Sequence, residues 1–270
     1  MWHSGTKNLL LTQICYRTPL PNNICDRFSL LLTLEPQFPQ EELTDVREPP
    51  QWLIETSESS RASGLLYFEE YGVCKKISDI LLEIRYLARF FPVQPEDISC
   101  PGFDHLDLHS KICLILQKLL QTEPDTEAGS QAACITECCR FAAAIFLFLP
   151  FDNHYPDPTL LNNSLVHKLQ IALGKITPCS SNRNKLLVWL FSVGGVAAMN
   201  LPAERDWFVG HLAELATKLE LKSWDEIKSC LEMVIWINAM GDEPFLQLWN
   251  EVLLNVTRTT IKEPFCAVRY

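Results

Sequence analysis

The sequence has no cluster of basic residues of the kind that binds nucleic acid. Lysine and arginine together number 23 against 33 acidic residues, so the formal net charge is −10. The nearest approaches to a basic patch are Lys75-Lys76 and the separated Arg183 and Lys185. Proteins that bind DNA neutralise its phosphates with grouped lysine and arginine side chains. We therefore predict that this chain does not bind nucleic acid by itself.

The sequence is also poor in glycine and in long apolar runs. Ten glycines stand against seventeen prolines, and no convincing alternation of apolar and polar residues indicates a strand, so helices are favoured over a sheet. The most apolar run, residues 141–149, is about half as long as a membrane-spanning helix. Residues 1–14 lack the pattern of a secretory signal peptide. We expect an intracellular protein with no membrane partner.

Eleven cysteines are present, an odd number that does not fit a secreted disulfide framework. Cys134, Cys138 and Cys139 fall in one predicted helix, where positions four apart share a face, so a metal site is one hypothesis. Zinc needs four ligands, and no second pair lies nearby in the sequence. The favoured interpretation is three small, buried apolar side chains in a reducing compartment.

Prolines divide the chain into an irregular first segment and a helical body. Six prolines fall within the first fifty residues and none between 51 and 91. From about residue 61, apolar residues recur at the spacing of one helix face, which predicts an all-α fold, a single large array of about eight to ten helices. The predicted domains are an irregular, acidic N-terminal segment at 1–60 (with at most a short helix near 28–34), a helical domain at 61–262 and a tail at 263–270.

The helices predicted from this spacing are separated by short loops. The helix at 128–149 becomes apolar all round from residue 141, so we expect it in the centre of the core. The complete set covers residues 73–91, 104–121, 128–149, 160–174, 182–199, 202–219, 223–235 and 242–256.

The last three predicted helices have readable starts. Pro202 suits the first turn of a helix, and Glu204 beside it complements the helix dipole. Ser223 and Glu226 have the spacing of a capping box, in which each side chain binds a free amide near the other residue. Asp242 is expected to cap the last helix.

One stretch combines histidines with carboxylates. His105 and His109 lie four residues apart, so a helix would place both on one face near Asp107. An all-α metal-dependent enzyme built on these residues is one hypothesis. The alternative is that the acids complement a helix dipole just after the Pro101-Gly102 turn. The remaining histidines add no matching ligand motif.

Gly194 and Gly195 lie among small residues, and no Gly-Lys-Ser/Thr follows them as a phosphate loop would require. Such a pair more often lets two helices approach closely. The sequence also has no nucleophile motif. It therefore assigns no catalytic, cofactor-binding or metal-binding residue, and we do not expect an enzyme.

Residues 35–58 are acidic and contain interspersed bulky apolar side chains. Seven acidic residues and one arginine occur there, and apolar residues such as Phe38, Trp52 and Ile54 lie between them. Acidic residues mixed with exposed apolar ones are typical of disordered activation segments. The alternative is an acidic linker whose Trp52-Leu53-Ile54 packs onto the helical body.

Three groups of residues occur in an order that resembles a known family. They are residues 137–147; residues 185–198 followed by 204–209; and residues 221–228 followed by Trp236 and 242–249. Over roughly residues 65–260 they resemble the fungal-specific transcription factor domain, the regulatory region of zinc binuclear cluster regulators.

The resemblance implies a helical array that regulates transcription in the nucleus through protein partners, such as a second copy or an intact transcription factor, and often through dimerisation and an effector. It implies no catalysis and, in this region, no cofactor. The family's DNA-binding module is an N-terminal run of six cysteines with basic residues, whereas Cys15 and Cys25 stand alone here. Three explanations remain open: a missing upstream portion, a regulator that lost its DNA-binding module, or a protein that pairs with an intact factor. A helical scaffold unrelated to transcription is a further alternative.

Overall fold

The computed structural model describes part of the chain, namely residues 67–88, 111–112, 114–119, 122, 130–149, 159–176 and 184–262. Regular structure within these ranges is helical and includes no strand, which confirms the predicted all-α class. The helices are η1 (Phe68–Tyr71), α4 (Lys75–Leu87), α6 (Gln131–Phe148), α7 (Thr159–Leu173), α8 (Asn184–Ala197), α9 (Pro202–Lys218), α10 (Trp224–Val234), η5 (Asn238–Met240) and α11 (Glu243–Lys262). Residues 111–112 and 114–119 are helical as well.

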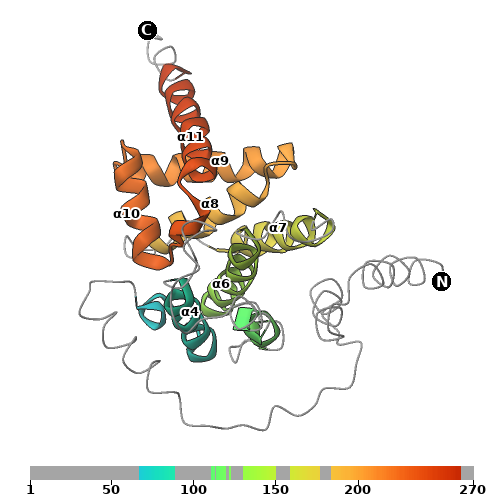
Figure 1. The fold of residues 1–270 in the computed structure, drawn as a ribbon. Helices are drawn as coiled ribbons and strands as arrows, with labels where there is room; N and C mark the ends of the chain where they lie inside the picture. Colours follow the sequence, from blue (N-terminus) through green and yellow to red (C-terminus); the bar gives the residue numbers. More distant parts are fainter. Residues whose placement is uncertain are drawn as a thin grey trace, which may run out of the picture.

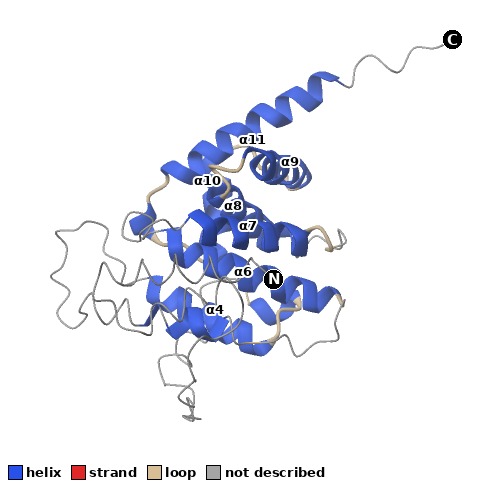
Figure 2. Ribbon diagram, turned by 90° about the vertical axis from the view of Figure 1, so that its right-hand side faces the viewer, coloured by secondary structure: helices blue, strands red, loops and turns tan. Residues whose placement is uncertain are grey.

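The helices are stacked one above another (Figure 1, Figure 2). α4 and α6 lie at one end of the stack, α7 and α8 follow, and α9, α10 and α11 lie towards the other end. α8 contacts α6, α7, α9, α10 and α11, and it is buried from Leu186 to Ala197. The other helices are therefore arranged around α8.

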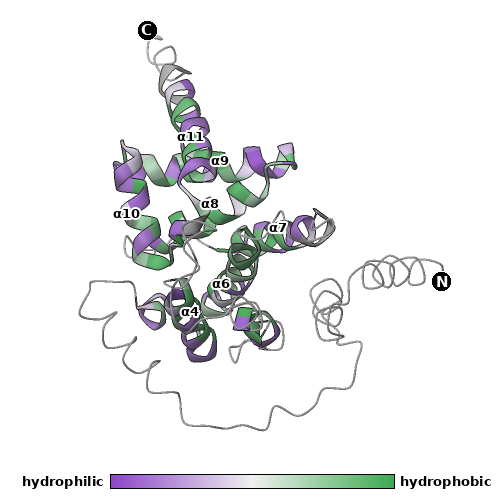
Figure 3. Cartoon of the chain, in the orientation of Figure 1, coloured by the Kyte–Doolittle hydropathy of each residue, from purple (hydrophilic) through white to green (hydrophobic). Residues whose placement is uncertain are grey.

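α6 is the second central helix, as its all-round apolar sequence predicts. Every residue from Cys138 to Leu147 is buried, and Figure 3 shows hydrophobic residues along α6, whereas α11 alternates between hydrophobic and hydrophilic. By length and composition alone α6 could cross a membrane, but 78% of it is buried inside the array. That burial is what the core helix of a packed array requires.

The predicted helix positions agree with the structure to within about four residues wherever both can be compared, except that α11 runs to Lys262, six residues beyond the predicted end at 256. The prediction for 223–235 is wrong at its end, because Ile235 is extended and α10 stops at Val234. The two short 3-10 helices were not predicted. Most of the predicted helix at 104–121, the segment 1–60 and the tail 263–270 lie outside the described residues.

Two adjacent glycines let α8 pack closely on two sides. A Cβ atom at Gly194 would collide with the Phe208 ring of α9 and would lie 3.0 Å from Leu169 Cδ2 of α7. A Cβ atom at Gly195 would lie 2.9 Å from each methyl carbon of Leu248 in α11. The interpretation of this pair as a close-packing feature is confirmed.

The C-terminal end of α10 is buried, and side chains from two other helices bind its last carbonyl groups. Arg85 of α4 donates from Nε to Val234 O at 2.8 Å and from Nη2 to Met233 O at 3.2 Å. Trp189 of α8 donates from Nε1 to Ile235 O at 3.0 Å. Carbonyls at a helix end lack partners within the helix, and a guanidinium also complements the negative end of its dipole. These bonds fix α10 against α4 and α8.

A carboxylate joins α10 to the start of α11. Asp242 precedes α11, as predicted, and its carbonyl accepts from Leu246 N at 2.8 Å. Its two carboxylate oxygens each lie 2.9 Å from Lys228 Nζ, and one accepts from Trp224 Nε1 at 3.2 Å. The hydrogen-bonded Lys228, followed by Trp224, holds the pKa of Asp242 below its ordinary value of 3.8.

The capping box at the start of α10 is confirmed. Ser223 Oγ accepts from Glu226 N at 3.3 Å, and Glu226 Oε2 accepts from Ser223 N at 3.1 Å. The Lys222 amide also donates to Glu226 Oε2, at 2.6 Å. These amides, Lys222 first, lower the pKa of Glu226. Pro202 occupies the first turn of α9, again as predicted.

We expect Gly194→Ala to lower the free energy of unfolding by about 1–3 kcal/mol, because the added methyl group displaces the Phe208 ring from a packed core. Gly210→Ala is a matched control, since a Cβ atom there meets no atom within 4 Å. It should raise stability by about 0.5–1 kcal/mol, the usual gain of alanine over glycine in a helix. Urea unfolding followed by circular dichroism measures both; equal effects of the two changes would contradict this account of the packing.

The lowered pKa of Asp242 predicts a loss of stability in acid. A depressed carboxyl pKa contributes stability that is fully present above the unfolded-state value and is lost as the pH falls through the lower folded-state value. Between about pH 6 and about pH 3, Asp242→Asn should therefore lose less stability than the unchanged protein. Urea midpoints at several pH values test this, with Asp206→Asn, at an exposed site on α9, as the control. Parallel curves for Asp242→Asn and the unchanged protein would show that the ion pair contributes nothing.

Candidate functional site

Arg205 joins three helices at one point. From α9 it donates from Nε and Nη2 to the two carboxylate oxygens of Glu251 in α11, each at 2.9 Å. Its Nη1 donates to the carbonyl of Gly195, near the end of α8. The Arg205 side chain is buried, whereas that of Glu251 is 38% exposed. Arg205 thus makes a bidentate ion pair with Glu251 and one further bond to a main-chain carbonyl, and bidentate, charge-assisted pairs are the strong hydrogen bonds of arginine.

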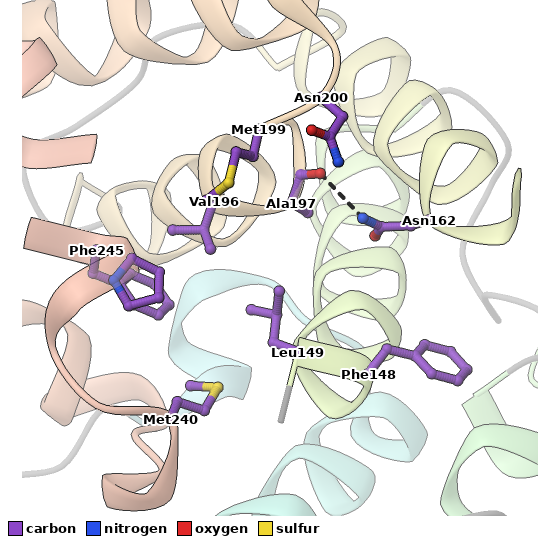
Figure 4. A pocket seen from close by; sticks show the side chains of 10 residues that line it. Phe148, Leu149, Asn162, Val196, Ala197, Met199, Asn200, Met240 and Phe245 are labelled. Atoms are coloured by element: carbon purple, nitrogen blue, oxygen red, sulfur yellow. Dashed lines mark hydrogen bonds between the residues drawn. The ribbon is translucent and has the colours of Figure 1, made fainter. Parts of the chain in front are cut away.

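A cavity of about 170 Å³ lies beside this junction. It opens where α6 and α8 end and where α7 and α11 begin, with η5 closing a further side. Figure 4 shows Leu149, Val196, Phe245 and Met240 around the space, while Phe148 points away. Val196 and Phe245 are buried, so part of the cavity wall belongs to the core.

Polar groups lie at one side of the cavity. Asn162 of α7 donates from Nδ2 to Ala197 O, the last residue of α8, at 3.1 Å (Figure 4). Asn200 follows in the turn after α8 and also lines the space. Next to it, Met199 lines the cavity and is 51% exposed. The site thus combines an apolar interior with two amides, an arrangement suited to binding rather than to proton transfer.

The three cysteines of α6 are buried, as predicted. Cys138 and Cys139 have no exposed surface and Cys134 has 8%. Burial above all, and then the neighbouring thiols Cys139 and Cys134, raises the pKa of Cys138; burial and Cys74 raise that of Cys139. Thiols held in the protonated form are poor nucleophiles and poor metal ligands. Within the part of the chain that the structure describes, no three His, Cys, Asp or Glu side chains are placed to hold a metal ion.

The two described histidines make separate contacts. His167 Nε2 lies 3.4 Å from Glu204 Oε1. His211 stacks on the Phe191 ring with centroids 5.5 Å apart, and its Nδ1 lies 2.9 Å from Trp207 O. Each histidine thus joins neighbouring helices, and the two do not share a site.

The remaining sequence candidates lie outside the described residues. His105, Asp107 and His109, the basis of the enzyme hypothesis, fall there, and so does the acidic segment 35–58. Of the sequence candidates, the structure therefore places the α6 cysteines and the Gly194-Gly195 pair.

Sequence reasoning missed both Arg205 and the cavity. Arg205 has an ordinary place in an amphipathic helix, and nothing local indicates its partner Glu251, 46 positions away. The cavity has a faint signal in Asn200, a polar residue shortly after the apolar sequence of α8.

No family model, curated protein or solved structure matches the chain.

We expect Arg205→Met to lower the free energy of unfolding by about 2–4 kcal/mol, because it removes three hydrogen bonds at a buried junction. Glu251→Gln should cost about 1 kcal/mol, since that carboxylate is partly exposed. The double variant should be less destabilised than the sum of the single changes, because the two side chains act as one unit.

Urea unfolding of the four proteins gives this double-mutant cycle. Lys75→Met is the matched control, because the Lys75 side chain is 76% exposed and its ion pairs, with Asp79 at 3.6 Å and Glu69 at 4.0 Å, are long. It should change stability by less than about 0.5 kcal/mol. Strict additivity of Arg205→Met and Glu251→Gln would rule out the coupling.

Proposed function

We propose that this chain is a regulatory and interaction domain of the fungal zinc-cluster transcription factor type. It acts in the nucleus through protein partners, either a second copy of itself or an intact transcription factor. Its effect on DNA is indirect, through the partner.

The observation that carries the proposal is where the family-like residues fall. Residues 137–147 lie in α6, 185–197 in α8, 204–209 in α9, 224–228 in α10 and 243–249 in α11. α8 contacts each of the other four helices. The resemblance thus concerns one packed unit rather than scattered amphipathic helices, which supports a common domain type.

The use of buried charge is consistent with a binding domain. Arg85 and Arg205, both buried, are engaged in joining helices, and Lys228 is engaged in holding the start of α11. Side chains committed in this way stabilise a scaffold. The net charge of −10 also disfavours contact with phosphates.

The full 270-residue chain should show no salt-sensitive binding to double-stranded DNA at physiological ionic strength, because a net charge of −10 releases few counterions from DNA. Fluorescence anisotropy of labelled duplexes, from about 50 to about 200 mM salt, measures this. Tight, sequence-specific binding by this chain alone would contradict the proposal.

A separate experiment measures the regulation of transcription directly. The chain is fused to an unrelated DNA-binding domain in a fungal host, and reporter transcription is compared with that domain alone. We expect a change in transcription that is reduced by the destabilising Arg205→Met and retained in Gly210→Ala. A reporter unaffected by a stably expressed fusion would speak for the unrelated scaffold instead.

A further inference from the structure

The cavity between α6, α7, α8, η5 and α11 is large enough for one ring. Its volume is about 170 Å³, and an apolar cavity of about 150 Å³ in another protein takes up benzene. Val196 and Phe245 give it rigid walls, because they are 6% and 3% exposed and belong to the core. Met240 and Met199 add flexible thioether side chains, which adapt to the outline of a guest and contact aromatic edges favourably.

The lining selects against charge. None of the described residues that line the cavity is ionisable, and its polar side chains are the amides of Asn162 and Asn200. An ionised guest would lose its hydration there without gaining an opposite charge. The lining therefore favours a neutral guest.

The polar side of the cavity carries two side-chain amides, which can both accept and donate hydrogen bonds. α8 ends at Ala197, and the last carbonyls of a helix carry the negative end of its dipole. The bond from Asn162 Nδ2 to Ala197 O fixes the amide, so its Oδ1 is an acceptor with a defined orientation. Asn200 supplies a second amide that lines the cavity. This side of the cavity suits a guest with a hydroxyl group, which can donate to an amide oxygen and accept from an amide N–H.

From size, the absence of charge in the lining and the two amides together, we infer that this cavity binds a small, neutral, single-ring compound that carries a hydroxyl group, of the phenol class. The ring occupies the space between Leu149, Val196 and Met240, and the hydroxyl donates to an amide oxygen of Asn162 or Asn200 beside the end of α8. The inference goes beyond the proposed function and does not depend on it, because it rests on the cavity alone.

Ligand-observed ¹⁹F NMR on the full chain tests the inference with three probes that share a fluorinated benzene ring and differ in one substituent. 4-Fluorophenol should bind saturably. Fluorobenzene, which lacks the donor, should bind more weakly, by about tenfold, the usual worth of one good hydrogen bond. 4-Fluorobenzoate, which is charged at neutral pH, should not bind. The melting temperature should rise with 4-fluorophenol concentration, because a guest that binds the folded state stabilises it.

Variants that fill the cavity locate the site. Leu149→Trp should weaken 4-fluorophenol binding at least about tenfold, because the larger ring takes the space of the guest. Met240→Trp, on another wall, is the second filling variant. Leu254→Trp is the matched control: Leu254 lies on α11, does not line the cavity and is 59% exposed. It should leave the dissociation constant within about twofold. Circular dichroism confirms that each variant is folded before binding is compared.

Three results would overturn the inference. The first is no saturable binding of 4-fluorophenol at millimolar concentration to the folded, unchanged protein. The second is unchanged binding in whichever filling variants fold. The third is binding of 4-fluorobenzoate as strong as that of 4-fluorophenol, which would exclude a neutral, amide-lined site. None of these results bears on reporter transcription or on DNA binding, so the inference can fail while the proposed function stands.

Discussion

The buried ends of α8 and α10 set the constraint on which this array depends. The last carbonyl groups of a helix have no partner within it, and a buried carbonyl left without a donor costs on the order of 1–3 kcal/mol. Arg205 and Asn162 donate to the end of α8, and Arg85 and Trp189 donate to the end of α10. All four side chains come from other helices. The two helices can therefore end inside the array only when their neighbours are in place.

This constraint also explains how an acidic protein uses its buried arginines. Arg85, Arg140 and Arg205 are at most 9% exposed, and each donates to a main-chain carbonyl outside its own helix. A guanidinium has five N–H donors in one plane, so it can reach a carbonyl and a second group at once. Burying such a charge is costly unless its bonds are satisfied. The arginines therefore make the helix junctions specific, because another packing of the same helices would leave these charges without partners.

The helices could be predicted from the sequence because their signals are local. Pro202 and the Ser223–Glu226 capping box each act within one turn of the helix they begin. The partners of Arg85 and Arg205 could not be predicted from the sequence, because they lie 149 and 46 positions away. No periodicity in the sequence specifies which distant group a side chain reaches. The cavity could not be predicted from the sequence for a related reason. It is the space that side chains from five elements fail to fill, so it depends on their combined volumes and not on any one motif.

The last turn of α8 shows why a cavity lies at this position and what it is connected to. Four helix ends meet there, and side-chain ridges that fill the grooves between long helices stop at such ends. Within this turn the Gly195 carbonyl accepts from Arg205, Val196 lines the cavity, and the Ala197 carbonyl accepts from Asn162. A guest in the cavity therefore touches the turn that joins α7, α9 and α11. Binding free energies are linked reciprocally. If the guest changes the equilibrium between two packings of α11 on this turn by some factor, a change from one packing to the other must change the affinity for the guest by the same factor.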